Sequence, residues 1–490
     1  MLALVLGAIV RAVPVLSTDF PLNDGGLFSV MSADLRDNGF LLPAMTSYNA
    51  ADIPFAYPPL GLYLNALLGL LFPGPETSLR FLPLLLAWLS IPAFYYMVRA
   101  LLARQAAAVA TLAWAVLPAA WMWPVTGGGV TRALGMVMGF LAVGCTVRLL
   151  QSGDRRWWVL APVLSGLTLL SHPESAAFVA TSLLVVLVAH HRRWRSLGVL
   201  VAVAAIAVLI AAPWWAIVLV THGPDPLTAA GQSRLMSIPL ALAILLNLQF
   251  TGEAYLAVGA VLGVVGLAIA VVTGQWWIIG WLVAIFVILP GGAGTYGLVP
   301  WSLLIAIGVT HLATLASARR AQVLGIGALG LATLASLWAS HENLGLLTSL
   351  TADQREAMAW TRQNTPPDAR FIVVTGADWP TDATAEWFPA LAQRHSVNTV
   401  QGLEFTTRDR WDAAISASNA AERCATSGIE CLLEWSARYA SFDYVFIPAG
   451  RTPGMTADEC CATLLDSLTS DERFSLRGEL AGGWVIERHP

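Results

Sequence analysis

The sequence has 490 residues, of which 57% are hydrophobic and 12% are charged, and its mean hydropathy is +0.66. An average soluble domain carries about 25% charged residues, so this composition excludes a water-soluble protein. The formal net charge is −4, and all 27 basic residues are arginines that form no basic stripe, which excludes a nucleic-acid-binding protein.

Apolar runs fill the first 340 residues and are separated by short polar breaks. Runs of about 20 apolar residues are long enough to cross a bilayer, so we predict a polytopic α-helical membrane protein. By the positive-inside rule, clusters of arginine mark the cytoplasmic loops. The clusters are Arg99/Arg104, Arg148/Arg155/Arg156, Arg192/Arg193/Arg195 and Arg319/Arg320. The runs lie near residues 2–17, 59–73, 79–98, 106–123, 130–150, 157–171, 175–190, 197–220, 237–250, 253–273, 276–290, 297–316 and 322–340.

Alternation of the loops between the two sides predicts about eleven transmembrane helices in residues 1–340. The runs 59–73 and 237–250 are expected to lie along the outer face or to dip into it, because the first opens with two prolines and the second is short. The first outer loop, about 18–78, and the segment 341–490 are then extracytoplasmic, and the protein is integral to the plasma membrane. A signal peptide is the alternative for run 2–17, although no small-residue cleavage site follows it.

Residues 341–490 are predicted to form a separate external domain. They hold 21 acidic residues against 12 arginines, and short strands alternate there with amphipathic helices, which is typical of a small α/β domain. We expect this domain to cover the membrane site and to help select the acceptor. The predicted strands are 370–375, 396–401, 444–448 and 484–488, and the predicted helices are 352–363, 408–421, 429–439 and 457–468.

Four of the five cysteines lie in this external domain, where an oxidising compartment permits disulfides. Cys424 and Cys431 flank a short turn and are able to bridge, whereas Cys460 and Cys461 bond elsewhere or stay reduced. A zinc site is the weaker alternative, because no pair of histidines with ligand spacing lies nearby.

The first outer loop contains the most informative segment of the sequence. Asp24 is followed by two glycines and then by a helical pattern over 27–36, which ends at Gly39. A carboxylate near a helix N-terminus is favoured in its ionised form, the form that a general base or a metal ligand needs. The alternative is that Asp24 is only a helix cap.

Several stretches of the chain resemble the GT-C superfamily of integral-membrane glycosyltransferases. The matching segments are NDGGLFSVMSADLRDNGF, FAYPPLGLYLNALL and, more loosely, SHPESAAF and GTYGLVPWSLLIA, with AMAWTRQNTPPDARFIVVTG in the external part. The layout is similar to that of dolichyl-phosphate-mannose-protein mannosyltransferases and aminoarabinose transferases, which use polyprenyl-phosphate sugars. The resemblance implies a polyprenyl-phosphate sugar donor, an unidentified glycan, lipid or protein acceptor, and transfer of a monosaccharide to an extracytoplasmic hydroxyl.

By the same resemblance Asp24 is the catalytic base of an inverting in-line displacement. Several members of the superfamily carry an Asp-Glu pair at this point, and some have a second acid in the next outer loop. This chain has Asn23-Asp24-Gly25 and an acid-free second loop, WPVTGGGVTR. A metal cofactor is therefore not certain, and if Mg²⁺ or Mn²⁺ binds, its expected ligands are Asp19, Asp24 and Glu174.

The remaining candidate residues are expected to bind the lipid phosphate or the sugar. Arg132 follows three glycines, whose backbone N–H groups and a guanidinium are able to cradle an anion, although it is also a candidate for a helix-end arginine that snorkels. His172 and Glu174 flank Pro173 at an outer helix junction, where Pro-Glu also serves simply to start a helix. The other candidates are Arg234 in its outer loop, Tyr57 in the Tyr-Pro-Pro run, and Tyr296, whose loop serves either as a lining segment or as a turn. Trp379 and Trp387 are suited to stacking on sugar rings, with ordinary packing as the alternative.

Two other functions stay open from the sequence. A transporter or flippase of lipid-linked sugars is one of them, but ionisable residues are almost absent from the middles of the apolar runs, where transport pathways need them. A non-catalytic assembly subunit with a transferase-like scaffold is the other, and the acid-poor second loop favours it.

Overall fold

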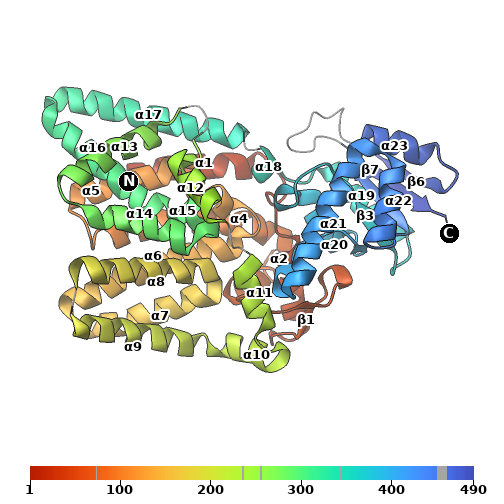
Figure 1. The fold of residues 1–490 in the computed structure, drawn as a ribbon, viewed down its shortest axis with the longest axis horizontal. Coiled ribbons are helices and arrows are strands. Elements are labelled where there is room, and N and C mark those ends of the chain that lie inside the picture. The colour runs from red at the N-terminus through yellow and green to blue at the C-terminus, as the bar shows by residue number, and fades with distance from the viewer. Residues whose placement is uncertain are drawn as a thin grey trace.

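The computed structural model describes residues 1–72, 74–191, 193–233, 237–253, 256–342, 344–449 and 461–489. A helical bundle occupies one side of the molecule, and a smaller part built on a β-sheet occupies the other (Figure 1). The first outer loop and helix α11 (Asp225–Ser233) lie at the junction between the two parts.

Several helices of the bundle are long and apolar enough to cross a membrane. Among the described residues five segments meet that test, and two bent helix pairs raise the number to seven by length and composition. The helices of the bundle are α1 (Leu2–Leu16), α4 (Pro75–Val98), α5 (Arg104–Val116), α6 (Gly129–Ser152), α7 (Arg155–Ser171), α8 (Pro173–His190), α9 (Trp194–Ile210), α10 (Ala212–His222), α13 (Val258–Val272), α14 (Trp276–Ile288), α16 (Leu298–Leu315) and α17 (Ala318–Glu342).

The two predicted runs 106–123 and 197–220 are each broken in the structure. The first bends by 87° between α5 and the segment Pro118–Val125, and the second bends by 62° between α9 and α10. Leu117 and Ala211 lie at the breaks, and a proline follows each of them within two residues. Proline removes a backbone N–H and disfavours the helical conformation of the residue before it, so a continuous helix ends there.

The two runs that were expected not to cross form short helices. Helices α3 (Leu60–Leu68) and α12 (Ile238–Leu246) have nine residues each. Nine helical residues span about 14 Å. The hydrocarbon core of a bilayer is about 30 Å thick, so neither helix is long enough to cross it. The total of eleven crossings stays a prediction, because α1, α13 and α14 are apolar but have only 15, 15 and 13 residues.

The C-terminal part contains a five-stranded sheet with the order β4-β3-β5-β7-β6. Strand β3 pairs in parallel with β4 and β5, whereas β7 pairs antiparallel with β5 and β6. The strands are β3 (Arg370–Val373), β4 (His395–Ser396), β5 (Tyr444–Pro448), β6 (Phe474–Leu480) and β7 (Gly483–Arg488). The helices are α18 (Leu344–Leu347), α19 (Ala352–Asn364), α20 (Ala383–Leu391), α21 (Arg408–Ser427), α22 (Ile429–Arg438) and α23 (Ala462–Thr469).

The strands and helices of this part match the predictions unevenly. Strand β5 has the predicted bounds, and α19 is one residue longer than predicted. The predicted strand 396–401 is wrong beyond Ser396, and strand β6 and helix α20 were not predicted. The predicted helix 457–468 lies partly outside the described residues.

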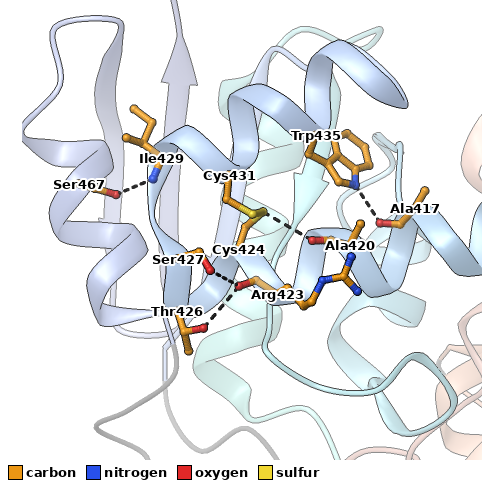
Figure 2. Close-up of a disulfide and its surroundings, with 10 residues drawn as sticks. All are labelled: Ala417, Ala420, Arg423, Cys424, Thr426, Ser427, Ile429, Cys431, Trp435 and Ser467. Atoms are coloured by element: carbon orange, nitrogen blue, oxygen red, sulfur yellow. Dashed lines mark hydrogen bonds between the residues drawn. A yellow bond between two sulfur atoms is a disulfide. The ribbon is translucent and has the colours of Figure 1, made fainter.

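A disulfide joins Cys424 at the end of α21 to Cys431 on α22, as Figure 2 shows. The turn between these helices is also held by Ile429, whose N–H donates to Ser467 Oγ. Cys145 is a free, buried cysteine of α6, and Cys460 lies outside the described residues. The disulfide and this hydrogen bond together link α21, α22 and α23.

The first outer loop is shared between the two parts of the molecule. It contains α2 (Gly26–Asp37) and two short paired strands, β1 (Met45–Thr46) and β2 (Ile53–Pro54). Helix α2 packs against α20 of the C-terminal part, and one apolar core includes Phe20, Leu27, Trp387 and Phe388 from the two sides. Burial of this shared core fixes the position of the C-terminal part over the loop that carries Asp24.

Candidate active site

The backbone around Asp24 forms a tight turn that leads directly into α2. Asn23 has a φ of 49° and Gly25 a φ of 141°, both outside the range that most side chains tolerate. A Cβ on Gly25 would also lie 2.8 Å from the Trp387 ring. Glycine at this position therefore satisfies both the conformation and the packing of the turn.

The Asp24 carboxylate is bound by two groups from the second outer loop and helix α6. The N–H of Gly128 donates to Asp24 Oδ1 at 2.8 Å, and Arg132 Nη2 donates to Asp24 Oδ2 at 2.5 Å. Both charged side chains keep 17% of their surface exposed. The carboxylate is thus oriented by an ion pair and a backbone donor and still faces open space.

Asp24 is not a cap of α2, and that alternative is wrong. The helix begins after Gly25, and its first N–H groups are bound by a side chain of the C-terminal part. Both oxygens of Glu386 accept from Gly25 N, at 2.9 and 3.1 Å, and Oε1 also accepts from Leu27 N at 3.1 Å. Glu386 was missed in the sequence because its partners lie 361 and 359 positions away.

Glu386 is almost completely buried beside Asp24. Burial, together with the negative charge of Asp24, raises the pKa of Glu386 to about 8, while the hydrogen bonds from Gly25 and Leu27 oppose that rise. The next residue, Trp387, donates from Nε1 to the carbonyl oxygen of Asn23 at 2.9 Å. The turn is therefore held from both sides, by α6 and by α20.

A cavity of about 550 Å³ opens in front of the Asp24–Arg132 pair. It is lined by residues of the bundle, of the first outer loop and of the C-terminal part. The predicted site residues that line it are Asp24, Tyr57, Arg132, His172, Glu174 and Tyr296. The structure thus brings together six residues that were singled out from distant points of the sequence, whereas Arg234 lies outside the described residues.

The cavity also contains polar and aromatic residues that were not singled out as site residues. Gln401 and Glu404 were missed, and Trp379 was noted only as a candidate for stacking. The other residues in this group are Trp123, Glu386 and Trp411. The residues of this group from the C-terminal part lie in α20, in the first turn of α21, or in loops and short helical turns, where the sequence has no chemical motif.

The four remaining predicted residues are held by elements of the bundle. His172 is buried between α7 and α8, and Glu174 lies in the first turn of α8. The hydroxyl of Tyr296 lies 2.6 Å from Ser175 Oγ, and the Tyr57 hydroxyl lies 3.3 Å from Thr131 Oγ1. These contacts fix the walls of the cavity on the side of the membrane helices.

A second cavity of about 600 Å³ adjoins the first and is lined mainly by apolar side chains. Its walls include Leu169, Val208, Trp214, Ile288 and Leu289, from α7, α9, α10 and α14 or the residue after it. The lining residues that the two cavities share are Tyr57, His172, Glu174, Gly291, Gly292 and Glu404. A polar chamber and an apolar one therefore meet at one boundary.

The three predicted metal ligands are not brought together. Asp19 does not line the cavity, and its carboxylate forms an ion pair with Arg355 of α19 at 2.6 Å. Within the described parts of the chain no group of three His, Cys, Asp or Glu side chains is arranged to hold a metal ion. The donor set thus does not fit the predicted Mg²⁺ or Mn²⁺ site, and dependence on a metal stays a prediction.

Comparisons with known proteins agree with this architecture. Residues 56–217 match the family model of dolichyl-phosphate-mannose-protein mannosyltransferases. No protein with a curated description matches the sequence. The fold is similar to ArnT from Cupriavidus metallidurans bound to undecaprenyl phosphate, with a TM-score of 0.58, 14% identity, and coverage of 99% of this chain and 97% of ArnT.

Two further solved structures share the fold. The oligosaccharyltransferase AglB from Archaeoglobus fulgidus, in complex with an inhibitory peptide and a dolichol-phosphate, has a TM-score of 0.59 and 13% identity over 91% of this chain and 69% of AglB. The arabinofuranosyltransferase AftD from Mycobacteria has a TM-score of 0.55 and 14% identity over 99% of this chain and 40% of AftD.

The apolar helices and the family match over residues 56–217 support an integral-membrane protein that is similar to glycosyltransferases. The fold is similar to that of the GT-C glycosyltransferases, as the sequence resemblance indicated.

Proposed function

We propose that this protein transfers a monosaccharide from a polyprenyl-phosphate carrier to an acceptor hydroxyl on the extracytoplasmic side of the plasma membrane. The observation that carries the proposal is the junction of the two cavities. The polar chamber holds the Asp24–Arg132 pair, and the adjoining chamber is lined by apolar residues of the membrane helices. A carrier with a long apolar chain and a phosphate head needs both environments side by side.

In the proposed reaction Asp24 is the general base. It accepts the proton of the acceptor hydroxyl as that oxygen attacks C1 of the sugar. The bond between C1 and the phosphate oxygen breaks, its electron pair leaves with the polyprenyl phosphate, and the configuration at C1 inverts. A phosphate is a good leaving group, so the reaction needs stabilisation of negative charge more than it needs a strong acid.

Arg132 serves both the base and the leaving group in this proposal. Its Nη2 binds Asp24, while Nη1 donates to the Trp123 carbonyl oxygen at 2.9 Å and to Thr126 Oγ1 at 3.1 Å. A donor phosphate in the cavity would compete with Asp24 for the Arg132 guanidinium and leave a carboxylate oxygen open to accept the hydroxyl proton. His172 and Glu174, at the boundary of the two cavities, are proposed to orient the phosphate.

The proposed mechanism contains no metal-dependent step, because the described side chains do not form a site for a metal ion. The structures of ArnT and AglB, which share the fold, contain undecaprenyl phosphate and a dolichol-phosphate, respectively. These ligands support a polyprenyl phosphate as the proposed carrier. Tyr57 and Tyr296 would line the space for the sugar. Their ordered hydroxyls are suited to hydrogen bonds with sugar hydroxyls.

The proposal is tested by an assay of the purified protein in proteoliposomes. The donors are undecaprenyl-phosphate monosaccharides labelled in the sugar, and the acceptors are a panel of cell-envelope glycans and lipids. We expect label to appear in an acceptor with release of undecaprenyl phosphate. Vectorial movement of the intact labelled lipid across the membrane, with no transfer, would contradict the proposal and favour a flippase.

A further inference from the structure

We infer that Glu386 is a positioning residue of the proposed reaction, which holds the turn 23–25 so that the Asp24 carboxylate faces the acceptor. The inference rests on the proposed function, because it assigns a role in the same site. It makes the C-terminal part a component of the active site and not only a cover over it.

The hydrogen bonds of Glu386 are directed at the backbone on both sides of the helix start. Gly25 N and Leu27 N are the donors, so the carboxyl group binds the residue that follows Asp24 and the first turn of α2. The N-cap of α2 is a glycine and has no side chain to serve this purpose. Glu386 therefore supplies from another part of the chain the cap that α2 lacks in its own sequence.

Packing alone does not explain a glutamate at this position. Its side chain is 2% exposed in a core that includes Phe20, Leu27 and Phe388, where an apolar residue would avoid the cost of burying a carboxyl group. The backbone N–H groups of α2 offset that cost only while α20 keeps its place against α2. The position of the turn and the docking of the C-terminal part are thus coupled.

A second contact from α20 holds the other side of the turn. Trp387 Nε1 binds the Asn23 carbonyl oxygen, and Asn23 Nδ2 donates to the Pro380 carbonyl oxygen at 3.3 Å. The backbone is therefore hydrogen-bonded to α20 on both sides of Asp24, at residues 23 and 25. Displacement of the turn by about 1 Å would misplace the base relative to its hydroxyl, which costs up to about 100-fold in rate.

Several other charged or titratable groups lie around Glu386. The charge of Asp24 acts on Glu386, Arg132 of α6 lines the same cavity, and Asp382, the N-cap residue of α20, lies one helical turn before Glu386. Tyr48 donates from its hydroxyl to the Glu386 backbone carbonyl oxygen at 2.6 Å, and Glu404 lines the same cavity. Because a change of charge at Glu386 would affect these groups, the test has to separate position from charge.

The variants Glu386→Gln and Glu386→Ala make that separation. Oε1 already accepts from both Gly25 and Leu27, so the glutamine oxygen is able to keep both hydrogen bonds without the charge. The matched control is Glu422→Ala, because Glu422 also binds two successive backbone N–H groups, those of Thr375 and Gly376, but does not line the cavity.

Two measurements are made on the full-length protein in detergent or proteoliposomes. The first is kcat and KM for transfer from the undecaprenyl-phosphate sugar. The second is amide hydrogen exchange of the peptide covering residues 22–30. We expect Glu386→Ala to lower kcat about 10- to 100-fold with little change in the donor KM and to speed exchange at 25–27. Glu386→Gln should retain slow exchange and most of kcat, and Glu422→Ala should leave both unchanged.

The outcomes that overturn the inference are distinct from those that overturn the proposed function. Wild-type kcat or unchanged exchange in Glu386→Ala would show that the residue does not hold the turn. An equal loss of kcat in Glu386→Gln and Glu386→Ala, with slow exchange kept in the glutamine variant, would assign Glu386 a role through its charge. If wild-type protein transfers no sugar to any acceptor, the proposed function fails, and the exchange measurement still decides whether Glu386 holds the turn.

Discussion

The indole Nε1 of Trp387 donates a hydrogen bond of 2.9 Å to the backbone carbonyl oxygen of Asn23, a residue 364 positions earlier in the chain. Trp387 is completely buried, so this bond is shielded from water. It joins the C-terminal part to the residue directly before Asp24. The candidate site is therefore built from two parts of the molecule that are separated in sequence by most of the membrane helices.

Trp387→Phe should lower the transfer rate without unfolding the protein. Phenylalanine fills most of the same space but has no N–H, so the Asn23 carbonyl oxygen loses its buried donor, at a cost of about 1 to 3 kcal/mol. We expect kcat to fall about tenfold in the proteoliposome assay. Trp435→Phe is the control, because Trp435 Nε1 donates to the Ala417 carbonyl oxygen at 2.8 Å away from Asp24 (Figure 2). Equal activities of the two variants would contradict this prediction.

Arg132→Gln should weaken the binding of a lipid phosphate. The substitution removes the cation that lies in the cavity beside Asp24 and within 5.0 Å of the Trp123 ring centre. Thermal shift or native mass spectrometry with undecaprenyl phosphate should show a loss of affinity of about tenfold or more. Undecaprenol, which has no phosphate, should bind the wild type and the variant equally.

The control for this measurement is Arg148→Gln, on the same helix. Arg148 binds the Tyr96 carbonyl oxygen and does not line the cavity. If Arg132→Gln bound undecaprenyl phosphate as tightly as the wild type does, Arg132 would not be a phosphate-binding residue.

Gly128→Ala should lower the transfer rate through steric overlap. A Cβ at this position would overlap Asp24 Oδ2 and lie 2.8 Å from Arg132 Nη2, so either the ion pair or the second outer loop has to move. We expect at least a tenfold loss of kcat. Gly198→Ala is the control, since a Cβ there would have no neighbour within 4 Å. Full activity of Gly128→Ala would mean that the observed ion pair is not needed for catalysis.

Stability of the C-terminal part should fall as the pH rises from about 5 to 8. Burial and the charge of Asp382 raise the pKa of Glu422 to about 8, from an ordinary value near 4.5. The folded state therefore binds more protons than the unfolded state between these two values, and the free energy of unfolding decreases with pH in that window. Because Glu386 and Asp382 also have raised pKa values, several groups act in the same direction.

The variant Glu422→Gln isolates one of these contributions. Glutamine carries no ionisable group, so the melting temperature of the variant should fall less steeply between pH 5 and pH 8 than that of the wild type. The measurement is a melting curve followed by fluorescence at each pH. Identical slopes for both proteins would show that Glu422 ionises in the folded protein at its ordinary pKa.

The local features of the fold could be predicted from the sequence. The helix after Asp24, strand β5 and helix α19 follow from short-range patterns, and α19 has the Thr351–Gln354 capping box that marks a helix start. Strand β6 was missed because FSLRGEL contains Gly and Glu, which are depleted in strands, and because most of its side chains are partly or fully exposed.

The sequence predicted only some of the distant residues that meet at the candidate site. Asp24 was identified by its place before a predicted helix and by the family resemblance, Arg132 by the glycine turn before it, and His172 and Glu174 by their place at a helix junction. Glu386 was not identified, because acidic residues are common in the C-terminal part, although the apolar sequence around it, ATAEWFPAL, indicates a buried helix. Its role depends on the packing of α20 against α2, a contact between segments that only the folded chain brings together.

The proposed role of Asp24 as the base of a sugar transfer is tested by the rate at which Asp24→Asn transfers sugar from an undecaprenyl-phosphate sugar. Asparagine keeps an oxygen for the Gly128 N–H but is unable to accept the hydroxyl proton. Asp37→Asn, at the exposed end of α2, is the control. We expect a folded Asp24→Asn protein that still binds undecaprenyl phosphate and loses at least about 100-fold in transfer rate. Turnover of Asp24→Asn at the wild-type rate would show that Asp24 is not the base.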